Sequence, residues 1–216
     1  PVHKYEIIES PVKKIRVGYL MYNSFTAGTK AEPEKYNNEL RSVSQKFKEA
    51  GVQAVILDLR YNEGGSMDCV QLLGTILTSA DRLGEPMAYL EYNDKNTDKD
   101  ATILFGTDRE INLNLHSLIA ITSGTTMGAP EMLIRSLFLT TIAGSTNYSE
   151  FLPFGTFDKD GKSERLLKIA IGVLDGTYPP KDDETPEEST TQTRFKVEKS
   201  VSSPASRRCS SKGLRL

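Results

Sequence analysis

The chain has 216 residues, of which 38% are hydrophobic, and this composition suits one globular domain with a full core. Its 27 basic and 29 acidic side chains give a formal net charge of -2, so there is no electrostatic basis for binding nucleic acid. The longest apolar runs, such as residues 54–57 and 118–122, are far too short to span a bilayer. Cys69, Cys209 and two histidines provide neither a disulfide framework nor a metal site, so no cofactor is expected.

The first half of the chain predicts alternating strands and helices. Residues 16–25 (RVGYLMYNSF) are apolar and rich in β-formers, which is typical of a strand. Residues 53–60 (QAVILDLR) form a nearly continuous apolar run, as in a parallel strand buried on both faces. A helix is expected after each of these two strands, and a further strand over residues 87–92. Apolar residues at helical spacing mark the two helices: Tyr36, Leu40, Val43, Phe47 and Ala50, ended by Gly51, and then Met67, Val70, Leu73, Leu77 and Ala80.

The second half continues the alternation and then loses it. A polar loop over residues 93–100 precedes a buried strand at 118–122 and a loop of small residues at 123–130 (SGTTMGAP). A helix over 131–139, a strand over 140–144 and a helix over 162–174 follow. From residue 177 the composition becomes rich in proline, serine, threonine and charge, which indicates a flexible tail.

This order of elements predicts an α/β domain with a mainly parallel sheet and right-handed crossovers. The expected organisation is an N-terminal lead-in over residues 1–13, left from a preceding region that is missing, a core domain over 14–176 and a loosely ordered tail over 177–216. Functional sites of such sheets lie beyond the carboxyl ends of the strands. The loops at that end are residues 61–66, 123–130 and 145–154.

Two of these loops can carry chemistry. Gly64 and Gly65 lead directly into a helix, so free backbone N–H groups there can hold a developing oxyanion or a carboxylate; the alternative is a tight strand-to-helix turn. The second loop offers the hydroxyls of Ser123, Thr125 and Thr126 in a strand–loop–helix arrangement typical of a nucleophile turn. The alternative is that these hydroxyls only cap the helix or bond within the loop.

Four segments resemble peptidase family S41, the C-terminal processing serine peptidases. Residues 14–25 (KIRVGYLMYNSF) resemble the family's opening Ile-Gly-Tyr-Leu…Ser-Phe strand. Residues 57–66 (LDLRYNEGGS) are similar to Leu-Asp-Leu-Arg-x-Asn-Pro-Gly-Gly, with Glu63 in place of proline. Residues 126–131 (TMGAPE) match the Thr-Ala-Ser-Ala-Ser-Glu block, and residues 142–150 (IAGSTNYSE) resemble Gly-Glu-x-Thr-x-Gly-Lys. The tyrosine- and asparagine-rich segments YNSF, DLRYN and EYN are most similar to S41 lipoproteins of Bacteroides-type bacteria.

The resemblance implies a crotonase/ClpP-like spiral domain and serine-type proteolysis near protein C-termini. Gly64 and Gly65 would lie at the oxyanion hole, joined by the backbone N–H of Ala129. The expected partner is an unstructured peptide or a protein C-terminus, which would add as an extended strand beside the site. Family members usually carry a preceding C-terminus-binding domain, which is not visible in this sequence. The implied location is the cell envelope, as a periplasmic or outer-membrane lipoprotein.

The chain departs from the family at the residues that cut the peptide bond. The nucleophile position falls on Gly128, where no acyl-enzyme can form, and the general-base lysine falls on Glu150, which has the opposite charge. The two positions where a third polar residue orients that lysine fall on Leu139 and Phe154. We therefore expect a catalytically impaired pseudopeptidase that still binds peptides.

Other functions stay open on the sequence. Thr126 or Ser123 can be a displaced nucleophile with Lys159 or Lys162 as its base, which would make the chain an active serine peptidase. Glu150 can alternatively activate a water near the vacant nucleophile position. A third possibility is a non-catalytic structural module of the cell envelope, because fold alone does not fix function.

Overall fold

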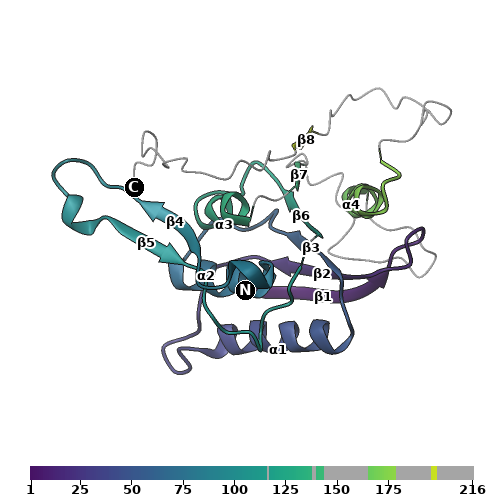
Figure 1. Cartoon of the computed structure of the whole chain (residues 1–216), viewed down its shortest axis with the longest axis horizontal. Coiled ribbons are helices and arrows are strands. Elements are labelled where there is room, and N and C mark those ends of the chain that lie inside the picture. The colour runs from purple at the N-terminus through teal and green to yellow at the C-terminus, as the bar shows by residue number, and fades with distance from the viewer. Residues whose placement is uncertain (116, 138–139, 144–164, 179–195, 199–216) are drawn as a thin grey trace.

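A computed structural model describes residues 1–115, 117–137, 140–143, 165–178 and 196–198. A six-stranded sheet in the order β1-β2-β3-β6-β7-β8 forms the centre, with helices on both of its faces (Figure 1). The strands are β1 (Val2–Glu9), β2 (Arg16–Tyr22), β3 (Ala54–Asp58), β4 (Pro86–Leu90), β5 (Ala101–Leu104), β6 (Ser117–Thr122), β7 (Thr140–Ala143) and β8 (Lys196–Glu198). The helices are α1 (Lys35–Glu49), α2 (Met67–Leu77), α3 (Ala129–Leu137) and α4 (Arg165–Asp175), with 3₁₀ turns η1 (Ala80–Arg82) and η2 (Thr97–Lys99).

The four inner strands are parallel, which confirms the predicted sheet. Ile56 of β3 lies opposite Tyr19 of β2 and Ile119 of β6, and β7 continues the parallel order. All five residues of β3 are buried, as its unbroken apolar run predicted. Because β2, β3 and β6 are parallel, the loops that follow them lie together beyond the carboxyl ends of the strands.

Both outer strands are antiparallel and lie outside the predicted core. β1 pairs with β2 and falls inside the predicted lead-in, and β8 pairs with β7 inside the predicted tail. The sheet therefore extends beyond residues 14–176. β1 was missed because its sequence, VHKYEIIE, has neither the continuous apolar run of the inner strands nor a strict alternation of polar and apolar residues, although its burial alternates along the strand.

Alternate residues of the inner strands build two hydrophobic layers. Leu57 and Leu59 face the cluster that includes α1, α2 and α3, whereas Ile56 faces the cluster that includes α4. Helix α1 approaches β2 closely at Gly18, because a Cβ placed there would lie 2.7 Å from the ring of Phe47. The predicted helix after β3 is α2, and Ser66 caps it by accepting a hydrogen bond from the Asp68 N–H.

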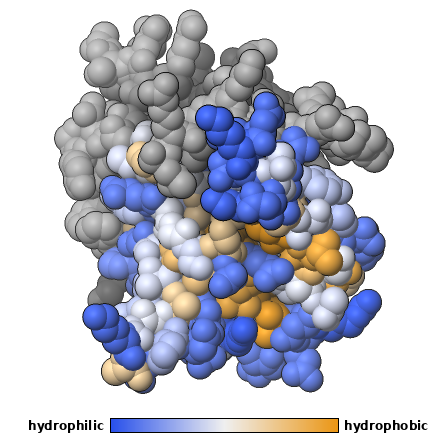
Figure 2. Space-filling model, turned by 90° about the vertical axis from the view of Figure 1, so that its left-hand side faces the viewer, coloured by the Kyte–Doolittle hydropathy of each residue, from blue (hydrophilic) through white to orange (hydrophobic). Residues whose placement is uncertain are grey.

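A second sheet of two antiparallel strands, β4 and β5, projects from the domain (Figure 1). The sequence predicted β4 but placed a polar loop over 93–100 without a strand after it. Met87 and Phe105 are buried and anchor the base of this hairpin, whereas Tyr89 and Leu104 are 49% and 43% exposed. Figure 2 views the molecule from the hairpin side and shows apolar side chains surrounded by polar ones.

The carboxylate of Asp175, at the end of α4, fastens the turn between β1 and β2. It accepts hydrogen bonds from the backbone N–H groups of Val12 (3.1 Å) and Lys13 (3.0 Å). Burial raises the pKa of Asp175, but hydrogen bonds from these two N–H groups and the Ser10 hydroxyl lower it by more. The pKa therefore lies below its ordinary value. The contact joins segments that are more than 160 positions apart in the chain.

This contact makes part of the stability pH-dependent. Because the folded pKa of Asp175 is depressed, its contribution is fully present above about pH 5 and is lost as the pH falls through the folded pKa, below about 4. Asp175→Asn should lower the free energy of unfolding by about 1–2 kcal/mol at pH 7 and by less near pH 3. Urea titrations at both pH values measure the difference, and an equal loss at the two would contradict this assignment.

Candidate functional site

The Gly64–Gly65 turn connects β3 to α2 in a backbone conformation that favours glycine. Its φ angles are +118° at Gly64 and +135° at Gly65. The buried amide of Asn62 shapes the turn, because its Oδ1 accepts from the Gly64 N–H (3.0 Å) and its Nδ2 donates to the Tyr22 carbonyl (2.8 Å). The turn is thereby fixed to the end of β2 as well as to β3.

Phe25 holds the other side of this turn. Its N–H donates to the Gly64 carbonyl (3.0 Å), and its own carbonyl accepts from the Ser66 N–H (2.8 Å). These two bonds form an isolated parallel bridge between Phe25 and Gly65. Since the residues on either side of Gly65 make the bonds of the bridge, the N–H of Gly65 itself points away from Phe25.

Gly128 lies at the mouth of helix α3. Its φ is +71°, and a Cβ built there would meet no atom of the described residues within 4 Å. Its N–H donates to the Glu131 carboxylate (2.9 Å), and its carbonyl accepts from the Met132 N–H (3.1 Å). Glu131 therefore caps the helix three residues from its start, as in half of a capping box, and the position of residue 128 itself is open.

The structure brings the paired glycines and the start of α3 together. A Cβ on Gly64 would lie 3.5 Å from the Met127 carbonyl oxygen and 3.8 Å from the Ala129 nitrogen. The Met127 N–H also points to the Asn62 carbonyl at 3.4 Å. The residues predicted for the oxyanion hole, Gly64, Gly65 and Ala129, thus lie beside Gly128. Glu150, Leu139, Phe154, Lys159 and Lys162 lie outside the described residues.

The loop hydroxyls that could replace the nucleophile are hydrogen-bonded to the end of β3. Ser123 and Thr125 both donate to the Arg60 carbonyl, the latter at 2.8 Å, and Thr126 donates to the Leu59 carbonyl at 2.8 Å. Thr126 Oγ1 also accepts from the Ser123 N–H (3.0 Å). These bonds fasten the loop before α3 to the end of β3. The hydroxyls therefore have a structural role, as in the alternative to the nucleophile turn.

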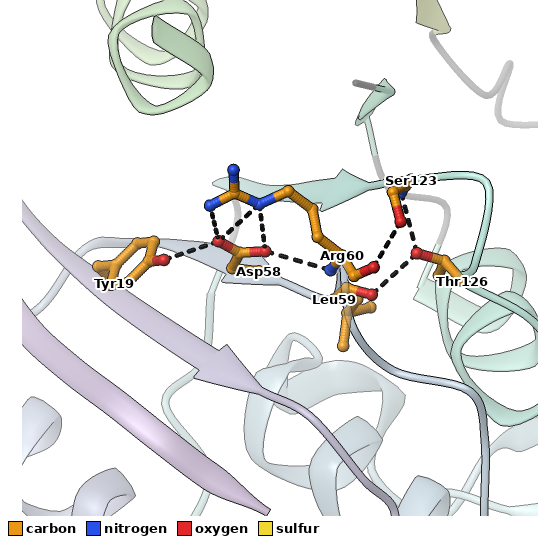
Figure 3. A network of polar contacts seen from close by, with 6 residues as sticks. All are labelled: Tyr19, Asp58, Leu59, Arg60, Ser123 and Thr126. Atoms are coloured by element: carbon orange, nitrogen blue, oxygen red, sulfur yellow. Dashed lines mark hydrogen bonds and ion pairs between the residues drawn. The ribbon is translucent and has the colours of Figure 1, made fainter. Parts of the chain in front are cut away.

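A buried ion pair between Asp58 and Arg60 fixes the end of β3 to which the loop hydroxyls bond (Figure 3). Asp58 is fully buried and Arg60 is 4% exposed; they share one face of the strand, and the guanidinium Nη2 lies 2.6 Å from the carboxylate. Arg60 Nε also donates to Asp58 (2.9 Å), and the Tyr19 hydroxyl donates to the same carboxylate (2.7 Å). The backbone of Arg60 is therefore held at the point where its carbonyl receives the loop hydroxyls.

Sequence reasoning missed the structural roles of Asp58, Arg60, Asn62 and Glu131. A signal for the first pair was present: opposite charges two positions apart share a face of a strand, and here they end an otherwise apolar run. A charge in such a place is buried only when it is paired. The amide clamp of Asn62 depends on the carbonyl of β2, so spacing within residues 61–66 could not predict it.

The thiol of Cys69 is not a substitute nucleophile. It is fully buried within the α1–α2 layer and lies 3.5 Å from the Asn37 side-chain oxygen. Burial is the main reason that the pKa of Cys69 lies above its ordinary value, and a protonated thiol is a weak nucleophile. Its position agrees with the interpretation of Cys69 as a small core residue.

The chain is similar to a known family of proteins over the segment that contains this site. The sequence profile of peptidase family S41 matches residues 16–140, which include the Gly64–Gly65 turn and the loop before α3. Among solved structures, a Bacteroides fragilis NCTC 9343 protein described as a candidate S41 protease is 31% identical, with a TM-score of 0.69. That match covers 82% of this chain and 58% of the other protein, so the chain spans well under two thirds of its length.

More distant structures are similar over part of the fold. The photosystem II D1 C-terminal processing protease is 17% identical, with a TM-score of 0.44, over 62% of this chain and 33% of its own. A lipoprotein from Streptococcus agalactiae is 17% identical, with a TM-score of 0.43, over 65% of this chain and 49% of its own. A search of curated protein sequences found no match.

Proposed function

Because the chain belongs to peptidase family S41, we propose that it binds extended peptide segments or protein C-termini and does not cut them. The observation that carries this proposal is the side-chain-free Gly128 beside the Gly64–Gly65 turn. A serine peptidase needs a hydroxyl at the helix mouth to form an acyl-enzyme. The backbone donors that would polarise a peptide carbonyl do not depend on that hydroxyl.

The contacts of the loop support loss of proteolysis over a displaced nucleophile. Ser123 and Thr126 donate their hydroxyl protons to the Arg60 and Leu59 carbonyls, so a base would have to break these bonds before either oxygen could attack. The side chain of Thr126 also lies on the β3 side of the loop. Near-attack geometry does not tolerate displacements of about an ångström or more.

The proposed ligand follows from the backbone groups that are available. The N–H of Gly65, turned away from Phe25, and the N–H of Ala129 at the start of α3 would hold a peptide carbonyl or a terminal carboxylate. The resemblance of the sequence to S41 lipoproteins of Bacteroides-type bacteria carries the proposed location in the cell envelope. In the described part of the chain no helix is long and apolar enough to cross a membrane.

Restoring both lost groups tests the proposal. Gly128→Ser together with Glu150→Lys should gain peptide-cleaving activity of at least about 10³-fold over the wild type, because nucleophile and base act as a unit. The open space around residue 128 accepts a serine, although its positive φ is expected to cost about 1 kcal/mol. Mass spectrometry of unstructured peptides incubated with each protein measures the cleavage.

The controls distinguish loss of the catalytic groups from loss of peptide binding. Each single substitution should stay inactive, and the wild type should bind the same peptides in a calorimetric titration without cleaving them. Labelling of wild-type Ser123 or Thr126 by a serine-directed phosphonate would instead show an active peptidase. Absence of peptide binding by both the wild type and the double variant would favour a structural module.

A further inference from the structure

Strand β1 leaves one edge of the large sheet without a partner among the described residues. It pairs only with β2 on its inner side, and its eight residues extend about 26 Å at the usual rise per residue. The single irregularity lies between Val2 and Lys4, so the rest of the strand is regular. Natural proteins usually shorten, bulge or cover such an edge, because its unpaired N–H and C=O groups template another strand.

Half of the side chains along this edge are apolar, and two of these are exposed. Tyr5 and Ile7 are 37% and 41% exposed, and they lie on the α1 side of the sheet, where the Tyr5 ring meets Phe47 edge-on at 6.2 Å. On the opposite side, Ile8 packs partly against the α4 layer. A neighbouring strand with apolar residues at alternate positions would bury Tyr5 and Ile7 further.

We propose that the occupant is β1 of a second copy of this chain, paired antiparallel about a two-fold axis perpendicular to the sheet. Such an axis continues the sheet from one copy into the other and keeps both α1 helices on the same face. Directly opposite residues of an antiparallel pair share a face, so the positions of paired residues must add to an even number. That condition leaves few registers.

Charge decides among these registers. A sum of eight places Lys4 opposite Lys4, and a sum of twelve places Glu6 opposite Glu6; like charges directly opposite destabilise a sheet. A sum of ten places Lys4 opposite the Glu6 of the second copy twice. Lys4 and Glu6 already lie 3.2 Å apart along one strand, so each would add a contact with the other copy.

The same register places the exposed aromatic residue of the strand at its centre. Tyr5 lies opposite itself on the two-fold axis, and Ile7 lies opposite the His3 of the second copy on the same face; Val2 lies beyond the irregularity and takes no part in this pairing. A sum of fourteen would instead place Ile7 opposite itself and Tyr5 opposite Glu9, with fewer paired residues. The strand is therefore self-complementary in one two-fold register. This surface is separate from the Gly64–Gly65 turn, so the inference does not depend on the proposed function.

Sedimentation velocity of the full chain from about 1 µM to about 1 mM tests the proposal. The wild type should change from monomer to dimer within this range, since a single strand pair is a small interface. Lys4→Glu and Glu6→Lys should each weaken the dimer at least about tenfold, because each places two like charges opposite each other twice. Lys35→Glu, an equal change of charge in an exposed pair with Glu32, should have no effect.

Mixing the two single variants separates pairing between copies from repulsion within a copy. The Lys4→Glu chain carries two acidic residues at positions 4 and 6, and the Glu6→Lys chain carries two basic ones, so the mixture restores every opposite pair. A heterodimer should therefore form although neither variant self-associates. A monomeric wild type at all concentrations, or a mixture that stays monomeric, would overturn the proposal.

Disulfide trapping tests the register independently. In a Cys209→Ser background, which leaves only the buried Cys69, Tyr5→Cys should form a symmetric cross-linked dimer on mild oxidation, because the two Cβ atoms face each other across the axis. Ile7→Cys lies opposite His3 in this register and should not. Cross-linking of Ile7→Cys alone would contradict the pairing proposed here.

Discussion

Replacing Gly65 by alanine is expected to lower the free energy of unfolding by at least about 3 kcal/mol and to abolish peptide binding. The added Cβ would lie 2.2 Å from the Phe25 carbonyl oxygen and 2.7 Å from its carbonyl carbon. Both are backbone atoms, which cannot rotate away as a side chain can. The φ of +135° is also outside the range that an L residue adopts readily.

Gly128→Ala provides the matched control, because it makes the same chemical change in the neighbouring loop. Residue 128 also has a positive φ, of +71°, but within the part of the chain that the structure describes its Cβ would have no neighbour within 4 Å. The expected loss is about 1 kcal/mol, from backbone strain alone. Urea denaturation of both variants measures the difference, and equal losses would mean that the contact with Phe25 does not define the turn.

Arg60→Met is expected to destabilise the protein by about 3–5 kcal/mol, because it leaves the carboxylate of Asp58 buried without its counter-charge. Asp58 would keep the Tyr19 hydroxyl and the Arg60 backbone N–H as donors. Two neutral donors do not replace a guanidinium that contacts the carboxylate at 2.6 Å. Denaturation midpoints and slopes in urea measure the change.

Two further variants show whether the loss comes from the unpaired charge. Tyr19→Phe removes one hydrogen bond to Asp58 and should cost only about 1–2 kcal/mol. Combining Asp58→Leu with Arg60→Met removes both charges and should recover a large part of the stability lost with Arg60→Met alone. If the double variant is less stable than both Asp58→Leu and Arg60→Met, the two charges together contribute net stability to the fold.

The same substitutions connect stability to the site. The Arg60 and Leu59 carbonyls accept the hydroxyls of Ser123, Thr125 and Thr126, and that loop leads into Gly128 and Ala129. Under conditions in which Arg60→Met remains folded, its affinity for peptides should therefore fall as well. The loop itself holds no charged side chain, so its position depends on these backbone acceptors.

The sequence determined the inner sheet and the loops at its edge. The apolar run before Asp58 marked a strand buried on both faces, and Gly51 marked a helix end, because these signals depend on neighbours along the chain. The family resemblance implies Gly64, Gly65 and Gly128 as site positions, and in the structure Gly64 lies next to the residues that flank Gly128. The departure at Gly128 was visible from residue identity alone.

The tertiary structure decided which groups are paired and where the sheet ends. Asp58 bonds Tyr19, which is 39 positions away, and Asp175 bonds the turn near Val12, more than 160 positions away. No local pattern encodes such contacts, because burial and partner are set only when distant segments pack. For the same reason β1, whose sequence has neither a continuous apolar run nor a strict alternation, was recognised as a strand through its pairing with β2.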